Sequence, residues 1–357
     1  EQIAAYEAEG RKAVVRFNAP DEGEAVVPAL IRGDITYQNK QIPDMVLLKS
    51  DGLPTYHLAN VVDDHLMKIT HIMRADEWIN TAPLHIHLYK AFGWEQPQYA
   101  HLSVVLNPNG KGKLSKRTQS FADGNQLVLV KVEEFEEAGY LPHALRNFLA
   151  NVGYSFGGDQ EKFTTQEAIE TFEIGKINPA PSRLPYSILI WLNGQYIQEM
   201  SPLELAQALK PFLDKEEYEV NPDILLLIAP SMRTRLKRLP EAIEFLEFLF
   251  EERPFALTTD QLTHGKLDAA AAQAAFSEAR KFIATVEPFT VEALGAGLRE
   301  IGEKYTANQK AGPFLGKMRL AVTGQKVSPP LFESVVALGR ERTLARLDDV
   351  LATFTPS

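Results

Sequence analysis

The sequence predicts an α/β fold in the first half of the chain and an all-α region in the second half. Residues 1–49 alternate short β-branched runs with Pro, Gly, Asn and Asp, a pattern typical of strands joined by hairpins and turns. Residues 55–66 carry apolar side chains with a helical period, and a strand candidate follows at 69–73. From residue 201 onward the apolar period is helical. A helix followed by a strand fits the returning half of a doubly wound nucleotide-binding fold, whose ligands lie at the carboxyl ends of the strands.

The elements of the first half can be placed in chain order. Between residue 81 and about residue 200, helices alternate with loops as far as a Trp-Leu-Asn-Gly turn at 191–194. The β-branched runs before this region predict strands at 14–17, 35–37 and 45–48.

Helix signals organise the second half. Ser201 is followed by a proline in the first turn and by a glutamate at the third helical position, which predicts a capped helix start. The alanine-rich segment 268–285 predicts another helix. The residue pattern changes along the chain near residues 50, 81 and 201.

Length, charge and cysteine content restrict the class of protein. A chain of 357 residues can form two or three domains. A net charge of −10 argues against a protein that coats nucleic acid through a broad basic surface, but it leaves room for a specific RNA ligand. The chain has no cysteine, which excludes a thiolate zinc site and a disulfide. Because no apolar run approaches the ~20 residues needed to span a bilayer, we expect no membrane association. Two local basic clusters stand out, Lys111, Lys113, Lys116 and Arg117, and Arg233, Arg235, Lys237 and Arg238.

The sequence Lys-Leu-Ser-Lys-Arg at 113–117 is the strongest chemical motif. Its two lysines lie three positions apart with a serine between them and two glycines before them, so two ammonium groups and a hydroxyl can reach one triphosphate. The structural alternative is a solvated basic loop. The preceding Asn-Gly-Lys-Gly-Lys lacks the spacing of a phosphate-binding P-loop, which argues against a kinase or ATPase of that type.

Three side chains form a candidate clamp for a small acid. Tyr56 and Asn60 lie four positions apart on the predicted helix, so both side chains emerge on one face. Arg74 lies at the end of the following strand, and an arginine can place two hydrogen bonds on one carboxylate. The alternative is a buried tyrosine and a structural ion pair between Arg74 and Asp76.

The run His57, Asp63, Asp64, His65 and His71 invites a metal hypothesis. Neighbouring positions on a helix point in different directions, and no pair with helical ligand spacing has a third ligand nearby. We therefore expect no metal site here and assign these residues to capping and hydrogen bonding.

Several segments of the chain resemble bacterial glutamyl-tRNA synthetases. Asp51 to Trp78 resembles the second half of their catalytic domain, and 113–117 matches the lysine-serine-lysine loop of class I aminoacyl-tRNA synthetases. Further segments resemble the same family in the same order, at 31–52, 88–94, 139–149 and 328–347. Local departures occur at Leu184-Pro185, at Ile188 and in the longer segment 118–130.

The resemblance implies a function for each segment. Residues 1–49 would be the end of the connective insertion, which holds the tRNA acceptor end, and residues 50–80 would be the second half of a class I Rossmann-like catalytic domain. Residues 81–200 would form a stem-contact region with the KLSKR loop. Two helical anticodon-binding subdomains would follow at 201–248 and 249–357.

The resemblance also implies the site residues. Tyr56, Asn60 and Arg74 would bind glutamate, with Arg74 on its side-chain carboxylate. Lys113 and Lys116 would be catalytic, neutralising the charge that moves as pyrophosphate leaves. The ATP site would comprise Glu77, Trp78, Val104, Val105, Lys113, Ser115 and Lys116. The anticodon would be contacted by Arg235 at its third base and by Arg319, Ser328, Leu331 and Phe332, a combination that suits unstacked bases.

The implied activity is that of a glutamate-tRNA ligase. ATP with Mg²⁺ would activate L-glutamate to glutamyl-adenylate once tRNA(Glu) is bound, and the glutamyl group would pass to the 3′-terminal adenosine. We expect a cytoplasmic monomer. Because the chain has no His-x-Gly-His-type motif, we also expect it to lack roughly the first quarter of the enzyme and to be inactive alone.

Three other functions share part of this sequence pattern. A glutaminyl-tRNA synthetase shares the catalytic fold but usually has a β-barrel anticodon region, whereas 201–357 is predicted to be helical. The paralogue that glutamylates a queuosine-modified tRNA is disfavoured because it lacks an anticodon domain. A non-catalytic tRNA-binding fragment or paralogue is suggested by the missing motif.

Overall fold

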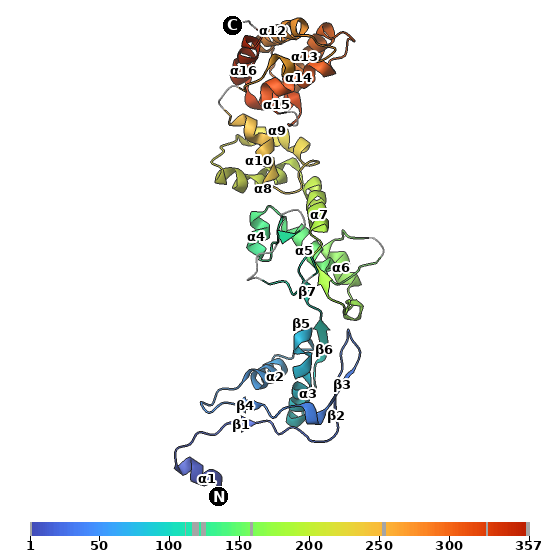
Figure 1. The fold of residues 1–357 in the computed structure, drawn as a ribbon, viewed down its shortest axis with the longest axis vertical. Coiled ribbons are helices and arrows are strands. Elements are labelled where there is room, and N and C mark those ends of the chain that lie inside the picture. Colours follow the sequence, from blue (N-terminus) through green and yellow to red (C-terminus); the bar gives the residue numbers. More distant parts are fainter. Residues whose placement is uncertain are drawn as a thin grey trace. The chain divides into compact units, whose positions relative to one another are not determined.

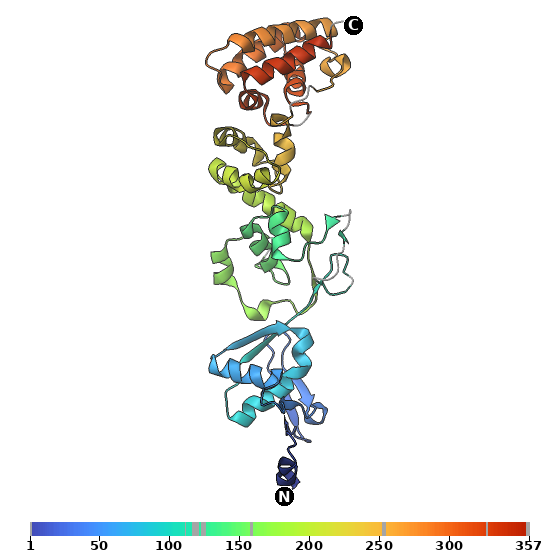
Figure 2. The same cartoon turned by 90° about the vertical axis from the view of Figure 1, so that its left-hand side faces the viewer.

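The structure, a computed structural model, has two compact units. It describes residues 2–110, 112–115, 121–122, 126–157, 160–251, 255–325 and 328–354, with backbone only at 121–122 and 126–127. The first unit comprises residues 1–131 and 146–186, and the second comprises 132–145 and 187–357. Figures 1 and 2 show the elements of both units.

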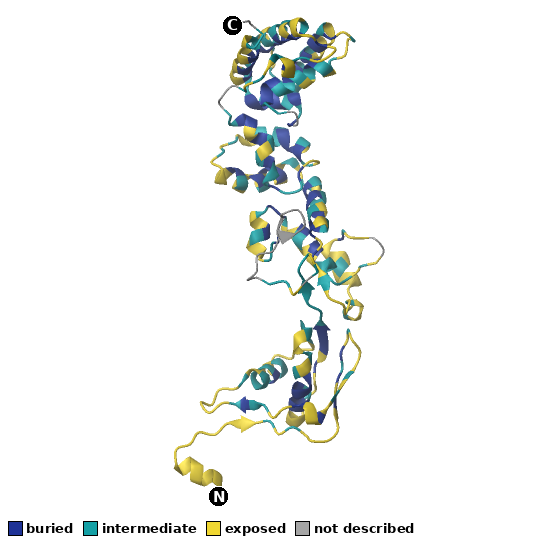
Figure 3. Ribbon diagram, in the orientation of Figure 1, coloured by how far each residue is buried: buried dark blue, intermediate teal, exposed yellow. Residues whose placement is uncertain are grey.

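The three predicted strands before residue 50 are present and, with a fourth strand that was not predicted, form two small antiparallel sheets. Strand β1 (Val15–Arg16) pairs with β4 (Val46–Leu48), and β2 (Glu24–Val27) pairs with β3 (Ile35–Gln38). The short helix η1 (Asn39–Gln41) follows β3. Residues 2–8 differ from the expected strand pattern: they form helix α1 (Gln2–Ala8), which buries no residue (Figure 3). A short helix that buries no side chain needs no apolar face, so its sequence lacks the periodic pattern by which a helix is recognised.

A parallel strand pair forms the centre of the first unit. Helix α2 (Tyr56–Leu66) precedes strand β5 (His71–Ala75), and η2 (Asp76–Thr81) and α3 (Ala82–Phe92) lead to β6 (Gln98–Leu102). Strands β5 and β6 pair in parallel, as Figures 1 and 2 show. The helix-then-strand prediction is therefore confirmed, although the strand begins two residues later than predicted.

Local sequence and burial fix these helices. Val61, at one of the predicted apolar positions of α2, is fully buried and packs with Leu84 and Leu88 of α3. Pro83 lies in the first turn of α3, and Gly93 ends the helix at φ +70°, a left-handed conformation that favours glycine. This core, which also includes Ala25 of β2 and Leu47 of β4, holds α2 and α3 together.

The remaining elements of the first unit are short. Strand β7 (Val105–Leu106) pairs in parallel with β10 (Ser182–Arg183), and β8 (Phe121–Ala122) pairs with β9 (Gln126–Leu127). Helix α6 (Thr165–Thr171) begins with a capping box from Thr164, and η3 (Ile174–Lys176) follows.

The second unit is built from helices. Its described residues after 186 contain no strand, only the isolated bridge between His264 and Leu267. Its helical elements are α4 (Val132–Glu137), the start of α5 (Pro142–Asn151), α7 (Tyr186–Glu199), α8 (Pro202–Lys215), α9 (Pro222–Met232), α10 (Glu241–Leu246), η4 (Glu247–Leu249), α11 (Thr259–Leu262), α12 (Ala269–Thr285), α13 (Val291–Tyr305), α14 (Gly312–Thr323), α15 (Leu331–Leu338) and α16 (Arg340–Ala352).

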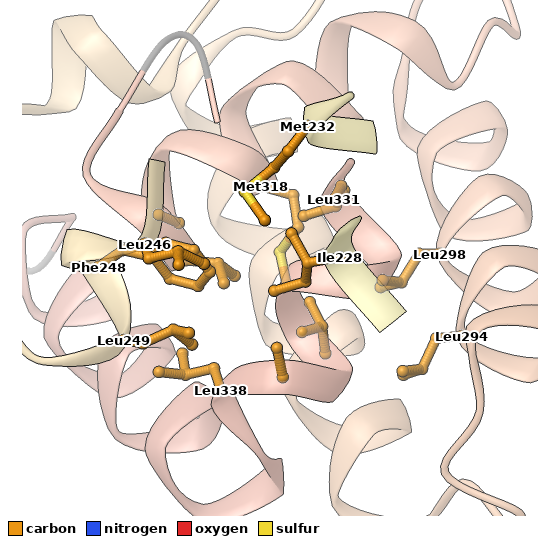
Figure 4. Close-up of a cluster of buried hydrophobic side chains, with 14 of the residues drawn as sticks. Ile228, Met232, Leu246, Phe248, Leu249, Leu294, Leu298, Met318, Leu331 and Leu338 are labelled. Carbon is orange, nitrogen blue, oxygen red and sulfur yellow. The ribbon is translucent and has the colours of Figure 1, made fainter. Parts of the chain in front are cut away.

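Both predicted helix starts are confirmed. Ser201 and Glu204 form a reciprocal capping box at the start of α8, and Asp268 caps α12. A single apolar core joins these helices. Figure 4 shows its centre, with side chains from Ile228, Met232, Leu246, Phe248, Leu249, Leu294, Leu298, Met318, Leu331 and Leu338.

The predicted turn at 191–194 is wrong, because helix α7 continues through it to Glu199. The polar residue of this segment has a structural use instead. Asn193 is fully buried; its Oδ1 accepts a hydrogen bond from the Leu141 amide at 2.7 Å, and its Nδ2 donates to the carbonyls of Gly139 at 3.2 Å and Lys237 at 2.6 Å. One amide thus satisfies three backbone groups from two distant segments.

We predict that Asn193→Ala destabilises the second unit. The substitution leaves buried backbone groups without partners, which should lower the free energy of unfolding by about 2–4 kcal/mol. Urea denaturation of the variant measures this loss. Gln195→Ala, two positions along the same helix, is the control and should change stability much less; equal losses in the two variants would contradict the role assigned to Asn193.

Candidate functional site

The carboxyl ends of β5 and β6 bring the candidate side chains together. Arg74 of β5 lies directly opposite His101 of β6 in the parallel register, and Ile72 lies opposite Tyr99. Alternate residues of a strand share a face, so Arg74, Tyr99 and His101 project from the same side of the sheet. The sequence placed Arg74 at a strand end, but it gave no sign of this pairing.

Among the described residues, the hydrogen bonds of Arg74 go to no acidic side chain. Its Nε donates to His101 Nε2 at 3.3 Å, its Nη2 donates to the Trp78 carbonyl at 3.3 Å, and its guanidinium carbon lies 5.8 Å from the Tyr99 ring centroid. Its Nη1 is buried and has no hydrogen-bond partner in the described part of the chain. The alternative ion pair with Asp76 is not formed, because Asp76 pairs with Arg32 at 3.1 Å.

Tyr56 and Trp78 extend the site from α2 to the segment after β5. Their ring centroids are 5.2 Å apart, and both side chains are partly exposed, Tyr56 at 50% and Trp78 at 36%. Asn60 lies one turn along α2 from Tyr56, and Asp64 lies one turn further. Burial, and then the charge of Asp63, raise the pKa of Asp64, while Arg74 and Asn60 act in the opposite direction.

The first lysine of the KLSKR motif reaches this site from a tight hairpin. The Leu114 amide donates to the Val105 carbonyl at 2.8 Å, and Asn107 N donates to Gly112 O at 3.0 Å. Lys113 at the base of this hairpin pairs with Glu77 at 2.8 Å. The loop therefore ties a predicted catalytic residue to a predicted ATP-binding residue.

Glycine is needed at the turn of this hairpin. Gly110 and Gly112 have φ of +76° and +73°, and a side chain at Gly110 would approach Arg183 Nε to 2.9 Å. The other predicted ATP-binding residues of the loop differ in how far the structure describes them. Val104, Val105 and Ser115 are half-buried, and Lys116 lies outside the described residues.

Three histidines surround Arg74, two of which the sequence analysis did not single out. His57 Nδ1 and His85 Nε2 lie 3.0 Å apart, and His85 is fully buried. Burial, and then the charge of Arg74, lower the pKa of His57, lower that of His85 to about 3 and lower that of His101 to about 4. Isolated histidines on an apolar helix and strand carry no motif, so only the register and packing reveal them.

The predicted anticodon-binding residues all lie in the second unit. The basic cluster that begins at Arg233 was expected to be helical, but it is not. Helix α9 ends at Met232, and the turn that follows carries Arg233 and Arg235. Arg235 Nη1 donates to the Ser328 carbonyl at 2.7 Å, whereas Arg233 Nη1 donates to the Met200 carbonyl at 2.9 Å. The structure thus joins Arg235 to the segment that precedes α15.

The other three predicted anticodon-binding residues differ in exposure. Leu331 is 4% exposed and belongs to the apolar core, and Phe332 packs under the guanidinium of Arg299 at 4.8 Å. Arg319 is half-buried, with an Nε that has no hydrogen-bond partner in the described structure. Their contact with RNA stays a prediction.

The described residues also limit metal and membrane sites. Within them, no group of three or more His, Cys, Asp or Glu side chains could hold a metal ion. Across the same residues, every helix is too short or too polar to cross a bilayer.

Comparisons with known proteins give a consistent result. Residues 1–183 match the family described as tRNA synthetases class I (E and Q), catalytic domain, and 204–351 match an anticodon binding domain. The glutamate–tRNA ligase of Roseiflexus sp. is 42% identical over 98% of this chain and 68% of its own length. That of Chloroflexus aurantiacus is 38% identical over 97% and 69%. The crystal structure of a glutamate tRNA ligase from Elizabethkingia meningosepticum, in complex with its amino acid, aligns with a TM-score of 0.79 at 28% identity, covering 99% of this chain and 71% of that one.

We predict that His85 makes the first unit sensitive to acid. Its folded-state pKa of about 3 lies below its unfolded value, so the unfolded chain binds the proton first. Stability is therefore present above the unfolded pKa and is lost as the pH falls toward 3, by about 2 kcal/mol at pH 5 relative to pH 8. His85→Gln should flatten this dependence in urea denaturation, whereas the exposed His71→Gln should not. Parallel pH profiles for wild type and His85→Gln would contradict the assignment.

Proposed function

This chain belongs to the glutamate–tRNA ligase family of class I aminoacyl-tRNA synthetases, and we propose that, within the intact protein, it takes part in activating glutamate with ATP and in transferring it to tRNA(Glu). Family membership confirms the resemblance found in the sequence, and with it the class I catalytic domain followed by a helical anticodon-binding domain. One observation supports the substrate assignment most directly: Arg74 is a half-buried guanidinium without an ion pair among the described residues.

The donors of Arg74 favour an acidic substrate. A buried N–H without a partner costs about 1–3 kcal/mol, so Nη1 favours a ligand that supplies an acceptor. A carboxylate is the acceptor that a guanidinium binds best, because two parallel hydrogen bonds can form. We assign the side-chain carboxylate of glutamate to Arg74. Tyr56 and Asn60 then face the remaining polar groups of the amino acid from α2.

The ATP site follows from the segments beside Arg74. Trp78 and Glu77 come directly after β5, and Val104 and Val105 follow β6, so the nucleoside would lie across both strand ends. In the first half-reaction an oxygen of the glutamate α-carboxylate attacks the α-phosphorus, and the bond to pyrophosphate breaks. Lys113 and Lys116 would neutralise the charge on the phosphate oxygens as it moves.

The Lys113 ion pair is compatible with this role. Both side chains are more than half exposed, Lys113 at 55% and Glu77 at 53%, and exposed pairs contribute only about 0–1 kcal/mol. A triphosphate can therefore replace Glu77 as the partner of Lys113 at small cost. Mg²⁺ enters this proposal as the counter-ion carried by ATP, which is its usual mode of binding in nucleotide sites.

The second half-reaction defines the partner. A ribose hydroxyl of the terminal adenosine attacks the glutamyl carbonyl, and AMP leaves. In the second unit, Arg235 would contact the third anticodon base, with Arg319, Ser328, Leu331 and Phe332 supporting the recognition. The helical second unit favours this family over the glutaminyl enzymes, for which a β-barrel was expected. We further propose that the protein acts as a cytoplasmic monomer.

We predict that Arg74→Ala impairs the use of glutamate. Removing the guanidinium leaves the substrate carboxylate without its partner and should cost on the order of 2–5 kcal/mol in kcat/KM for glutamate. ATP–pyrophosphate exchange with saturating tRNA(Glu), measured on the intact protein, gives this value. The control is Lys49→Ala, which removes an exposed cation paired with Asp51. A defect confined to the KM for ATP would reassign Arg74 to the nucleotide.

We predict that Arg235→Ala relaxes reading of the anticodon. The variant should lose about 1–3 kcal/mol in tRNA recognition and discriminate less at the third base. The measurement is kcat/KM for tRNA(Glu) transcripts that carry each base at that position. Arg233→Ala is the matched control, because its guanidinium is bonded to a different backbone segment. An even loss for all four transcripts with a weaker salt dependence would instead indicate a phosphate contact.

A further inference from the structure

His101 lies where it can control the direction of Arg74. The two residues are paired across β5 and β6, and the Arg74 Nε–His101 Nε2 distance of 3.3 Å is at the long end of hydrogen-bond geometry. His101 is fully buried, and its ring is stacked with that of Tyr99 at an interplanar angle of 5°. Burial and the neighbouring ring therefore restrict the orientation of His101 on the strand.

The hydrogen bond between Arg74 and His101 determines the protonation state and tautomer of the His101 ring. An arginine N–H can only donate, so Nε2 of His101 must offer its lone pair. A neutral imidazole that accepts at Nε2 carries its proton on Nδ1. Burial is the first cause of the lowered pKa of His101, followed by the charges of Arg74 and Arg32, with Asp76 acting in the opposite direction. A protonated ring would be a donor at both nitrogens and would repel Arg74.

The two hydrogen bonds of Arg74 divide its donors. His101 binds Nε on one edge of the guanidinium, and the Trp78 carbonyl binds Nη2. Because the guanidinium is planar and rigid, these two contacts set the direction of Nη1, the buried donor that has no described partner. With the Trp78 carbonyl as its only hydrogen-bond partner, the guanidinium plane of Arg74 could rotate about that single contact.

We propose that His101 is a positioning residue for the amino-acid substrate: as the neutral Nδ1–H tautomer it accepts the Arg74 Nε–H and thereby aims Nη1 at the substrate carboxylate. This inference rests on the proposed glutamate-binding role of Arg74. His101 itself does not touch the substrate. Its loss should therefore affect the KM for glutamate more than the KM for ATP.

The tautomer can be tested without any activity. In protein labelled with ¹⁵N at its eight histidines, two-bond ¹H–¹⁵N correlation spectra distinguish the Nδ1–H, Nε2–H and doubly protonated rings. The His101 signal, assigned by its loss in His101→Gln, should be the neutral Nδ1–H form at pH 6 in residues 1–357. A ring protonated on Nε2 at pH 6 would overturn the proposal, and this measurement needs no variant to keep its function.

Kinetics on the intact protein then separates positioning from packing. His101→Leu removes the acceptor and should raise the KM for glutamate about 10- to 100-fold, with the KM for ATP changed less than about threefold. His101→Gln restores an acceptor oxygen and should recover most of the loss. The control is Tyr99→Phe, which keeps the ring on the same face of the strand. Circular dichroism establishes that each variant is folded.

The outcomes distinguish this inference from the proposed function. A normal glutamate KM in His101→Leu, with a defect in Arg74→Ala, would refute positioning by His101 while leaving the role of Arg74 intact. Equal defects in His101→Leu and His101→Gln would also refute it, because they would show that the ring shape matters and the acceptor does not. A normal glutamate KM in Arg74→Ala would refute the proposed binding site itself.

Discussion

The candidate site depends on the parallel register of β5 with β6. Because the two strands run in the same direction, their carboxyl ends meet at one edge, and both following segments begin there. The segment after β5 supplies Glu77 and Trp78, and the hairpin after β6 supplies Lys113. The same register places Arg74 opposite His101. A shift of one residue would turn Arg74 to the other face and separate it from Tyr56 and Trp78.

The two positively charged side chains at this edge, Arg74 and Lys113, have different surroundings. Around Arg74, burial lowers the pKa values of His57, His85 and His101, so these rings stay neutral and add no further positive charge beside the guanidinium, which forms no ion pair among the described residues. Lys113, in contrast, already has an exposed partner in Glu77. The first arrangement favours an anion that stays bound through the reaction, whereas the second permits exchange. This difference agrees with the proposed roles, in which Arg74 holds a carboxylate and Lys113 releases pyrophosphate.

Features set by neighbouring residues could be predicted from the sequence, and those set by distant contacts could not. The apolar period of α2 and the capping box at Ser201 were both correct, because each depends on residues within a few positions. The pairing of Asp76 with Arg32 spans 44 residues, and that of Arg74 with His101 spans 27. No local pattern distinguishes such partners. The helical course of 191–194 was missed for the same reason, since the partners of Asn193 lie 44–54 residues away.

Arginines in both units use backbone carbonyls as their fixed contacts, and what remains of each guanidinium decides its role. Arg346 is buried and donates to the carbonyls of Val322, Phe248 and Glu251. Carbonyls at the C-terminal end of a helix have no partner within the helix, and a side-chain donor can satisfy them. Burial lowers the pKa of Arg346 to about 10, and both of its terminal nitrogens are engaged, so its function is structural. Arg74 and Arg235 each place one terminal nitrogen on a carbonyl, and the Nη1 of Arg74 has no hydrogen-bond partner among the described residues. A carbonyl contact fixes a guanidinium without neutralising its charge. The ligand contacts proposed for Arg74 and Arg235 require this arrangement, because a preorganised guanidinium loses little side-chain entropy on binding.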